Sequence, residues 1–142
     1  MRTKYADCTR PLVRLPMEGE RECVLMEWWV VAVNGAWFNV PAGTQTDGAS
    51  VPRLLWRVCG HPLTPPRVYA ALLHDWLYGG VSGVTRKRAD RCYRDMLLHF
   101  AAVEAAEMQG VRLAVFRAAS WCEAEIEYLA LRLCGWTHWL RK

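Results

Sequence analysis

The segment AALLHDWLY, residues 70–78, decides the architecture of the second half of the chain. It is apolar nearly all round, which is typical of a buried helix, and a Gly-Gly pair follows it. We therefore predict a helix over residues 67–78. Two ionisable side chains, His74 and Asp75, lie in its middle, and a buried charge must be paired or bound to a cation. The segment therefore predicts a polar site inside the protein.

A second helix, predicted from residue 86 to about residue 108, supplies a partner for that site. Its Asp90 is in helical register with three residues that face the interior: Tyr93, Leu97 and Phe100. Because the connection between the two helices is short, we expect antiparallel packing, with His74 hydrogen-bonded to Asp90 directly or through one water. Tyr78 lies one turn after His74 and shares its face. Asp95 lies off this stripe and is expected to be solvated.

A third long helix is predicted over residues 112–133. Apolar side chains recur along it in steps of four and three: Val115, Ala119, Cys122, Ile126, Leu129 and Leu133. Such a stripe is typical of the face that a helix turns toward the core. We expect these six side chains to be buried.

The first half of the chain is predicted to be β. Short strands are expected within residues 10–16, at a sheet edge, and within residues 23–33. Asn34-Gly35 then precedes a β-prone run, residues 36–40, and Asn-Gly between two such runs predicts a hairpin. A loop rich in turn formers follows over residues 41–50, and a short helix is predicted over residues 51–58.

Strands followed by helices predict an α+β fold, with an N-terminal β-hairpin or meander followed by a bundle of three to four helices. The 142 residues are expected to form one domain. Its parts are a β-rich segment (residues 10–40), a loop with a short helix (41–60) and a helical segment (65–142).

Composition excludes several classes of protein. Apolar residues make up 53% of the chain, which supports a packed core, but no apolar run approaches the ~18 residues of a membrane span. Six cysteines without a CxxC pair argue against a structural zinc site. The net charge of +4 is low for a dedicated duplex binder, so no specific nucleic-acid partner is expected. The N-terminus does not resemble a signal peptide, which indicates the cytoplasm or a particle.

The predicted His74–Asp90 pair allows two interpretations. A carboxylate on one imidazole nitrogen fixes the tautomer and leaves the other nitrogen as a base, while Asp75 could hold a hard cation such as calcium. Alternatively, the His, the two Asp and the Tyr78 hydroxyl form a structural polar network. Asp47 likewise fits either an additional carboxylate of this site or ordinary turn chemistry before Gly48.

Three motifs resemble a family of phage and prophage proteins without an assigned function. They are TDGASVPR (residues 46–53), HDWLY (74–78) and the Ala89-Asp90 pair, in this order along residues 40–100. The resemblance implies a phage-encoded product located in the host cytoplasm or in the virion. It implies no activity.

The helix with His74, Asp75 and Tyr78, followed by an antiparallel helix with Asp90, is similar to the helix pair of secreted phospholipases A2. The resemblance implies that His74 is the general base, that Asp75 binds calcium, and that Asp90 orients His74 while Tyr78 bonds Asp90. The calcium loop of that family differs in pattern from the loop here, where Gly43 and Gly48 are the available glycines. The cysteines that flank the histidine in that family are absent.

Two function classes follow. One is a small calcium-dependent, phospholipase A2-like hydrolase of ester bonds. In this class His74, Asp90 and Tyr78 form the catalytic set, Asp75, Asp47 and Gly48 form the metal site, and the substrate is a lipid or another envelope component. The other is a non-catalytic virion or tail component, or a protein that binds a phage or host factor, in which the polar network is structural.

Overall fold

The computed structural model describes residues 2–48, 61, 63–79 and 83–134. Six strands come first: β1 (Ala6–Cys8), β2 (Val13–Arg14), β3 (Cys23–Leu25), β4 (Trp29–Val33), β5 (Ala36–Val40) and β6 (Gln45–Thr46). Three helices follow: α2 (Arg67–Tyr78), α3 (Arg86–Ala105) and α4 (Gly110–Cys134). The expected α+β fold is confirmed. The short helix predicted over residues 51–58 lies outside the described residues.

The strands form two small antiparallel sheets, with orders β1-β4-β5 and β2-β3-β6. The predicted hairpin is confirmed as β4–β5, and both of its turn residues, Asn34 and Gly35, have a positive φ (52° and 75°). Two strands were not predicted. β1 pairs with β4, and β6 lies within the segment expected to be a loop.

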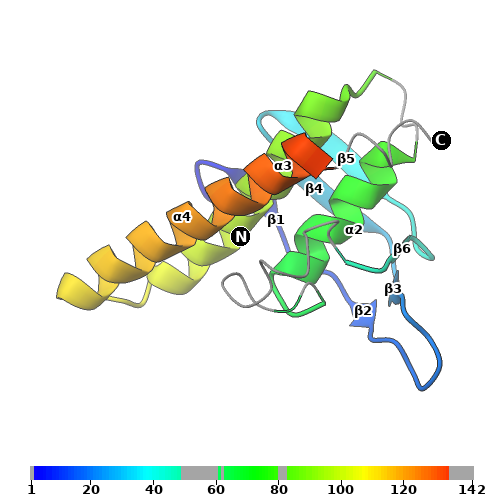
Figure 1. Ribbon diagram of the computed structural model, residues 1–142, viewed down its shortest axis with the longest axis horizontal. Helices are drawn as coiled ribbons and strands as arrows, with labels where there is room; N and C mark the ends of the chain where they lie inside the picture. Colours follow the sequence, from blue (N-terminus) through cyan, green and yellow to red (C-terminus); the bar gives the residue numbers. More distant parts are fainter. Residues whose placement is uncertain (1, 49–60, 62, 80–82, 135–142) are drawn as a thin grey trace.

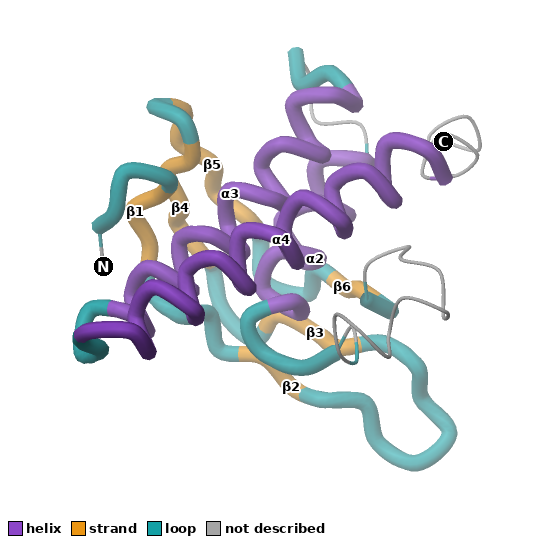
Figure 2. Tube along the Cα trace, turned by 60° about the vertical axis from the view of Figure 1, so that its left-hand side comes forward, coloured by secondary structure: helices purple, strands orange, loops and turns teal. Residues whose placement is uncertain are grey.

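α2 and α3 lie against one face of the β1-β4-β5 sheet, and α4 packs on α3 (Figures 1 and 2). Along β4, Trp29, Val31 and Val33 are buried, whereas Val30 between them is 51% exposed. The buried strand residues form one core with α2 and α3 side chains such as Leu73. α3 and α4 run side by side as the long helical pair of Figure 1, and the views agree on this.

The prediction for the buried face of α4 is wrong. The six residues of the predicted stripe are all exposed, Val115 by 62% and Leu133 by 75%. The opposite face is buried instead, and it carries Ala124, Glu127, Ala130 and Leu131. Small alanines permit close approach to α3, and the Glu127 carboxylate finds partners there, which are described below. An apolar stripe shows that a face can be buried, but it does not decide between two candidate faces.

The expectation that Asp95 is solvated is also wrong. Asp95 is 4% exposed, and its Oδ2 accepts a hydrogen bond of 2.6 Å from Asn34 Nδ2. Its Oδ1 accepts a 3.0 Å bond from Arg94 Nε. The turn of the β4–β5 hairpin is therefore tied to α3 by a side-chain contact that no local pattern signals.

Among the described residues, no helix is both long enough and apolar enough to cross a membrane. Among the described cysteines, Cys23, Cys92 and Cys122 are free thiols. Burial raises the pKa of the Cys8 and Cys92 thiols to about 11, so both are protonated at neutral pH.

Candidate active site

His74 and Asp90 meet at the packed faces of α2 and α3. His74 Nε2 lies 3.0 Å from Asp90 Oδ1, and the side chains are 2% and 0% exposed. The predicted hydrogen bond is therefore confirmed, and it is direct. Both helices are apolar around the pair, because α2 buries Leu73 and Leu77 on the same side and α3 buries Tyr93. The two polar side chains are therefore held in place within the core.

Asp90 has further partners from three directions. The Tyr78 hydroxyl donates to the same Oδ1 that faces His74, and Arg132 Nη1 of α4 donates to Oδ2 at 2.8 Å. Arg86 Nε lies 3.8 Å from Oδ2. Burial alone would raise the pKa of Asp90, but the hydrogen bonds from His74, Tyr78 and Arg132 outweigh it and lower that pKa. Asp90 is thus ionised and can accept a hydrogen bond from the protonated Nε2 of His74.

Sequence reasoning missed both arginines. Arg86 stands four residues before Asp90, and this i, i+4 spacing on one helix was an available signal. Arg86 Nη2 also donates to the backbone carbonyls of Leu131 (2.8 Å) and Arg132 (2.7 Å), which holds the last turn of α4 against the site. Arg132 is 42 positions away from Asp90, and no local pattern indicates that contact.

The other ring nitrogen of His74 points toward the edge of the site. Its Nδ1 lies 3.4 Å from Asp75 Oδ1, and the Asp75 side chain is 28% exposed. Burial disfavours the charged imidazolium, but the hydrogen bonds and negative charges of Asp75 and Asp90 prevail, so the pKa of His74 is raised. Both ring nitrogens therefore face a carboxylate. Because Nε2 makes the shorter bond, to the fully buried Asp90, we expect Nδ1 to be the nitrogen that loses its proton when the ring becomes neutral.

Thr46 of β6 completes the outer part of the site. Its Oγ1 donates to Asp75 Oδ2 at 2.6 Å and accepts a 3.0 Å bond from the backbone N–H of Gly48. Thr46 begins the TDGASVPR motif, but no role was predicted for it, and it contacts Asp75 directly. Asp47 is exposed, and Gly48 is buried with a φ of +97°.

The donor set around Asp75 is small. In the described part of the chain, no group of three or more His, Cys, Asp or Glu residues could hold a metal ion. Asp75 offers one carboxylate, and a cation there would need further oxygen ligands, such as backbone carbonyls or waters, because calcium takes six to eight. The roles of Asp75, Asp47 and Gly48 at a metal stay predictions.

A second buried network adjoins the first. Glu127 of α4 is 1% exposed, and its carboxylate accepts from Tyr93 Oη at 2.5 Å and from Arg67 Nε at 2.9 Å. The Tyr93 ring stands edge-on to the His74 ring, with centroids 5.6 Å apart. Arg67 also bonds Glu123 at 3.0 Å. These contacts join α2, α3 and α4 next to His74.

A protein-family model, "Protein of unknown function (DUF1353)", matches residues 23–115. Since the match covers more than half of the chain, the protein belongs to this family. The matched region includes His74, Asp75, Tyr78 and Asp90, whereas Arg132 lies beyond it.

Two curated proteins of Sinorhizobium fredii (strain NBRC 101917 / NGR234) are similar to the chain. "Uncharacterized protein y4iH" is 32% identical over 87 residues, which cover 61% of this chain and 36% of the relative. "Uncharacterized protein y4jT" is 40% identical over 43 residues, which cover 30% of this chain and 13% of the relative. The chain thus spans about a third of the length of the first relative and less of the second. No solved structure gives a significant match.

Proposed function

We propose that the protein is a hydrolase of ester bonds in which His74 acts as the general base. One observation carries the proposal: His74 Nε2 is held by the Asp90 carboxylate at 3.0 Å while Nδ1 faces the partly exposed Asp75. A carboxylate that holds one imidazole nitrogen fixes the ring, so that the other nitrogen can accept a proton from water. The local similarity to the phospholipase A2 helix pair supports lipid esters as the substrate class.

The supporting side chains suit this role. Tyr78 and Arg132 hold the Asp90 carboxylate, so the imidazole is oriented by a group that is itself fixed on both oxygens. Because the pKa of His74 is raised, the basic form becomes more abundant as the pH rises above the ordinary value of about 6.5. We therefore expect the rate of hydrolysis to increase as the pH rises above about 6.5.

A hard cation is part of the proposal. A calcium ion bound through Asp75 would supply positive charge next to the base, where an ester oxygen develops negative charge. It would also offset one of the two carboxylates that favour imidazolium, and so lower the pKa of His74. Asp47 and the backbone of Gly48 are the proposed additional ligands from the neighbouring loop.

Hydrolysis of a short-chain phosphatidylcholine, with and without calcium, tests the activity. The wild-type protein is expected to release fatty acid, and His74→Gln is expected to lose roughly a hundredfold or more of the rate, which is the usual contribution of a general base. His61→Gln is the matched control, because His61 is an exposed histidine. Equal rates for the two variants, or no release by the wild type, would contradict the proposal.

Calcium binding is tested separately by calorimetry and tryptophan fluorescence, with Trp76 next to Asp75 as a reporter. We expect the wild type to respond to millimolar calcium and Asp75→Asn not to respond, because the amide keeps the shape but lacks the charge that a hard cation needs. The amide oxygen can still accept the bond from Thr46, so the fold should survive. A flat wild-type titration by both methods would remove the cation from the proposal.

A non-catalytic role is the second candidate, and the bond from Arg132 to Asp90 favours it. That contact ties α4 to the α2–α3 pair, and every buried side-chain nitrogen and oxygen of the described residues has a partner. Such a network can serve only to fix the helix packing. The protein would then act through its surface as a phage virion or tail component, or as a binder of a phage or host protein. Absence of hydrolysis together with absence of calcium binding would support this role.

A further inference from the structure

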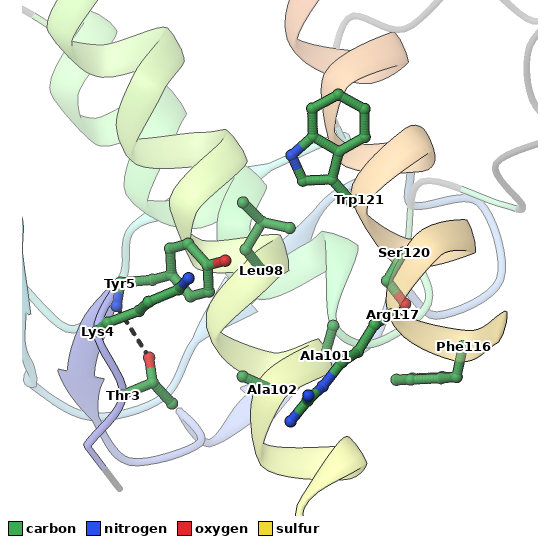
Figure 3. A pocket seen from close by; sticks show the side chains of 10 residues that line it. All are labelled: Thr3, Lys4, Tyr5, Leu98, Ala101, Ala102, Phe116, Arg117, Ser120 and Trp121. Atoms are coloured by element: carbon green, nitrogen blue, oxygen red, sulfur yellow. Dashed lines mark hydrogen bonds between the residues drawn. The ribbon is translucent and has the colours of Figure 1, made fainter. Parts of the chain in front are cut away.

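A cavity separate from the His74 site opens between the N-terminal arm (residues 3–5), α3 and α4 (Figure 3). Its volume is about 460 Å³, within the range of roughly 300–1,000 Å³ that is usual for small-molecule sites. Its walls are largely apolar and come from three segments: Tyr5 of the arm, Leu98, Ala101 and Ala102 of α3, and Phe116 and Trp121 of α4. The two alanines leave open the space that larger side chains would fill.

The wall formed by the arm is anchored to the core. Thr3 Oγ1 lies 3.0 Å from His99 Nδ1 and accepts bonds from the backbone N–H groups of Tyr5 (3.1 Å) and Ala6 (3.3 Å). The other nitrogen of His99 lies 3.5 Å from Cys8 Sγ of β1. His99 is fully buried, and burial lowers its pKa, so the anchor is uncharged at neutral pH. No role for His99 was predicted from the sequence.

The charged groups around the cavity are of one sign. Lys4 and Arg117 line it, and none of the described residues that line it is acidic. Arg117 reaches from α4 toward Ala101 and Ala102 of α3 (Figure 3), and Lys4 Nζ lies 5.0 Å from the centre of the Tyr5 ring. Within the described ranges, neither cation takes part in an ion pair. Two unpaired cations beside apolar walls are complementary to an anion that carries a hydrophobic body.

We propose that this cavity binds a medium-chain carboxylate, with the hydrocarbon chain against the alanines, Leu98 and Phe116 and the carboxylate between Lys4 and Arg117. Ser120 offers a hydroxyl on the same wall. The inference rests on the cavity alone and does not depend on the proposed hydrolase activity.

Calorimetric titration of the full chain with octanoate, octan-1-ol and acetate tests the proposal. Octanoate is expected to bind with one site, octanol more weakly because it lacks the charge, and acetate not at all because it lacks the chain. In the double variant Lys4→Gln/Arg117→Gln, octanoate binding should weaken by roughly fivefold or more while octanol binding stays unchanged. Arg112→Gln, which removes an exposed cation of α4 outside the cavity, should bind octanoate like the wild type.

Two more variants locate the site. Ala102→Phe should fill the cavity and abolish octanoate binding, whereas Ala114→Phe, at an exposed position of α4 outside it, should not. His74→Gln should bind octanoate unchanged, which separates this cavity from the proposed active site. The proposal is overturned if wild-type protein does not bind octanoate, if the double variant binds it undiminished, or if His74→Gln abolishes the binding.

Discussion

Replacing Asp90 by alanine is expected to lower the free energy of unfolding by about 4 kcal/mol, the usual cost of removing one partner of a buried ion pair. The substitution leaves His74 Nε2, the Tyr78 hydroxyl and the Arg132 guanidinium without the carboxylate that they share. Removing a buried acceptor also costs the desolvation of each stranded donor. Urea unfolding followed by circular dichroism measures the loss.

Glu104→Ala is the matched control for Asp90→Ala, because Glu104 is an exposed acid on the same helix. Its loss should change stability by no more than ~0.5 kcal/mol. Asp95 cannot serve as this control, since it is buried and bonded to Asn34. Equal urea midpoints of unfolding for Asp90→Ala and Glu104→Ala would show that the polar network contributes nothing to the stability of the fold.

Glu127→Ala is expected to destabilise the protein by about 3 kcal/mol, since it strands the buried Tyr93 hydroxyl and leaves the largely buried Arg67 guanidinium with Glu123 alone. Glu127→Gln should cost less. Burial raises the pKa of Glu127 despite its partners, and the amide keeps an acceptor while removing a charge that burial penalises. Denaturant unfolding of both variants gives the comparison.

The control for Glu127 is on the same helix. Glu125 bonds Arg94 at 3.3 Å near the surface, so Glu125→Ala should cost less than about 1 kcal/mol. If Glu125→Ala were as destabilising as Glu127→Ala, the burial of Glu127 would not be the cause. Such a result would also undermine the reason given for the orientation of α4, whose apolar stripe faces solvent while Glu127 faces the core.

Local periodicity predicts one part of this protein well. His74, Tyr78 and Asp90 lie on helices whose apolar residues recur at helical spacing, and a short connection makes those helices neighbours. Their meeting therefore follows from spacing alone. The hairpin at Asn34-Gly35 follows in the same way, because its backbone geometry is a property of those two residues.

Contacts between distant segments were not predictable in this way. Thr46 bonds Asp75 across 29 positions, and Arg132 bonds Asp90 across 42. Each depends on where a whole strand or helix docks. The orientation of α4 shows the same limit, since its exposed face is at least as apolar as its buried one. The buried face carries Glu127, whose partners Tyr93 and Arg67 compensate for its burial. Hydropathy along the helix does not reveal such partners.

The ionisation of His74 tests the central claim, that Nδ1 of His74 is a base oriented through Nε2 by Asp90. A pH titration by long-range ¹H–¹⁵N NMR of labelled protein, with the ring assigned by comparison with His74→Gln, reports the tautomer and the pKa together. We expect neutral His74 to carry its proton on Nε2 and the pKa to lie above the ordinary value of about 6.5. A neutral ring protonated on Nδ1, or a pKa below that value, would contradict the account.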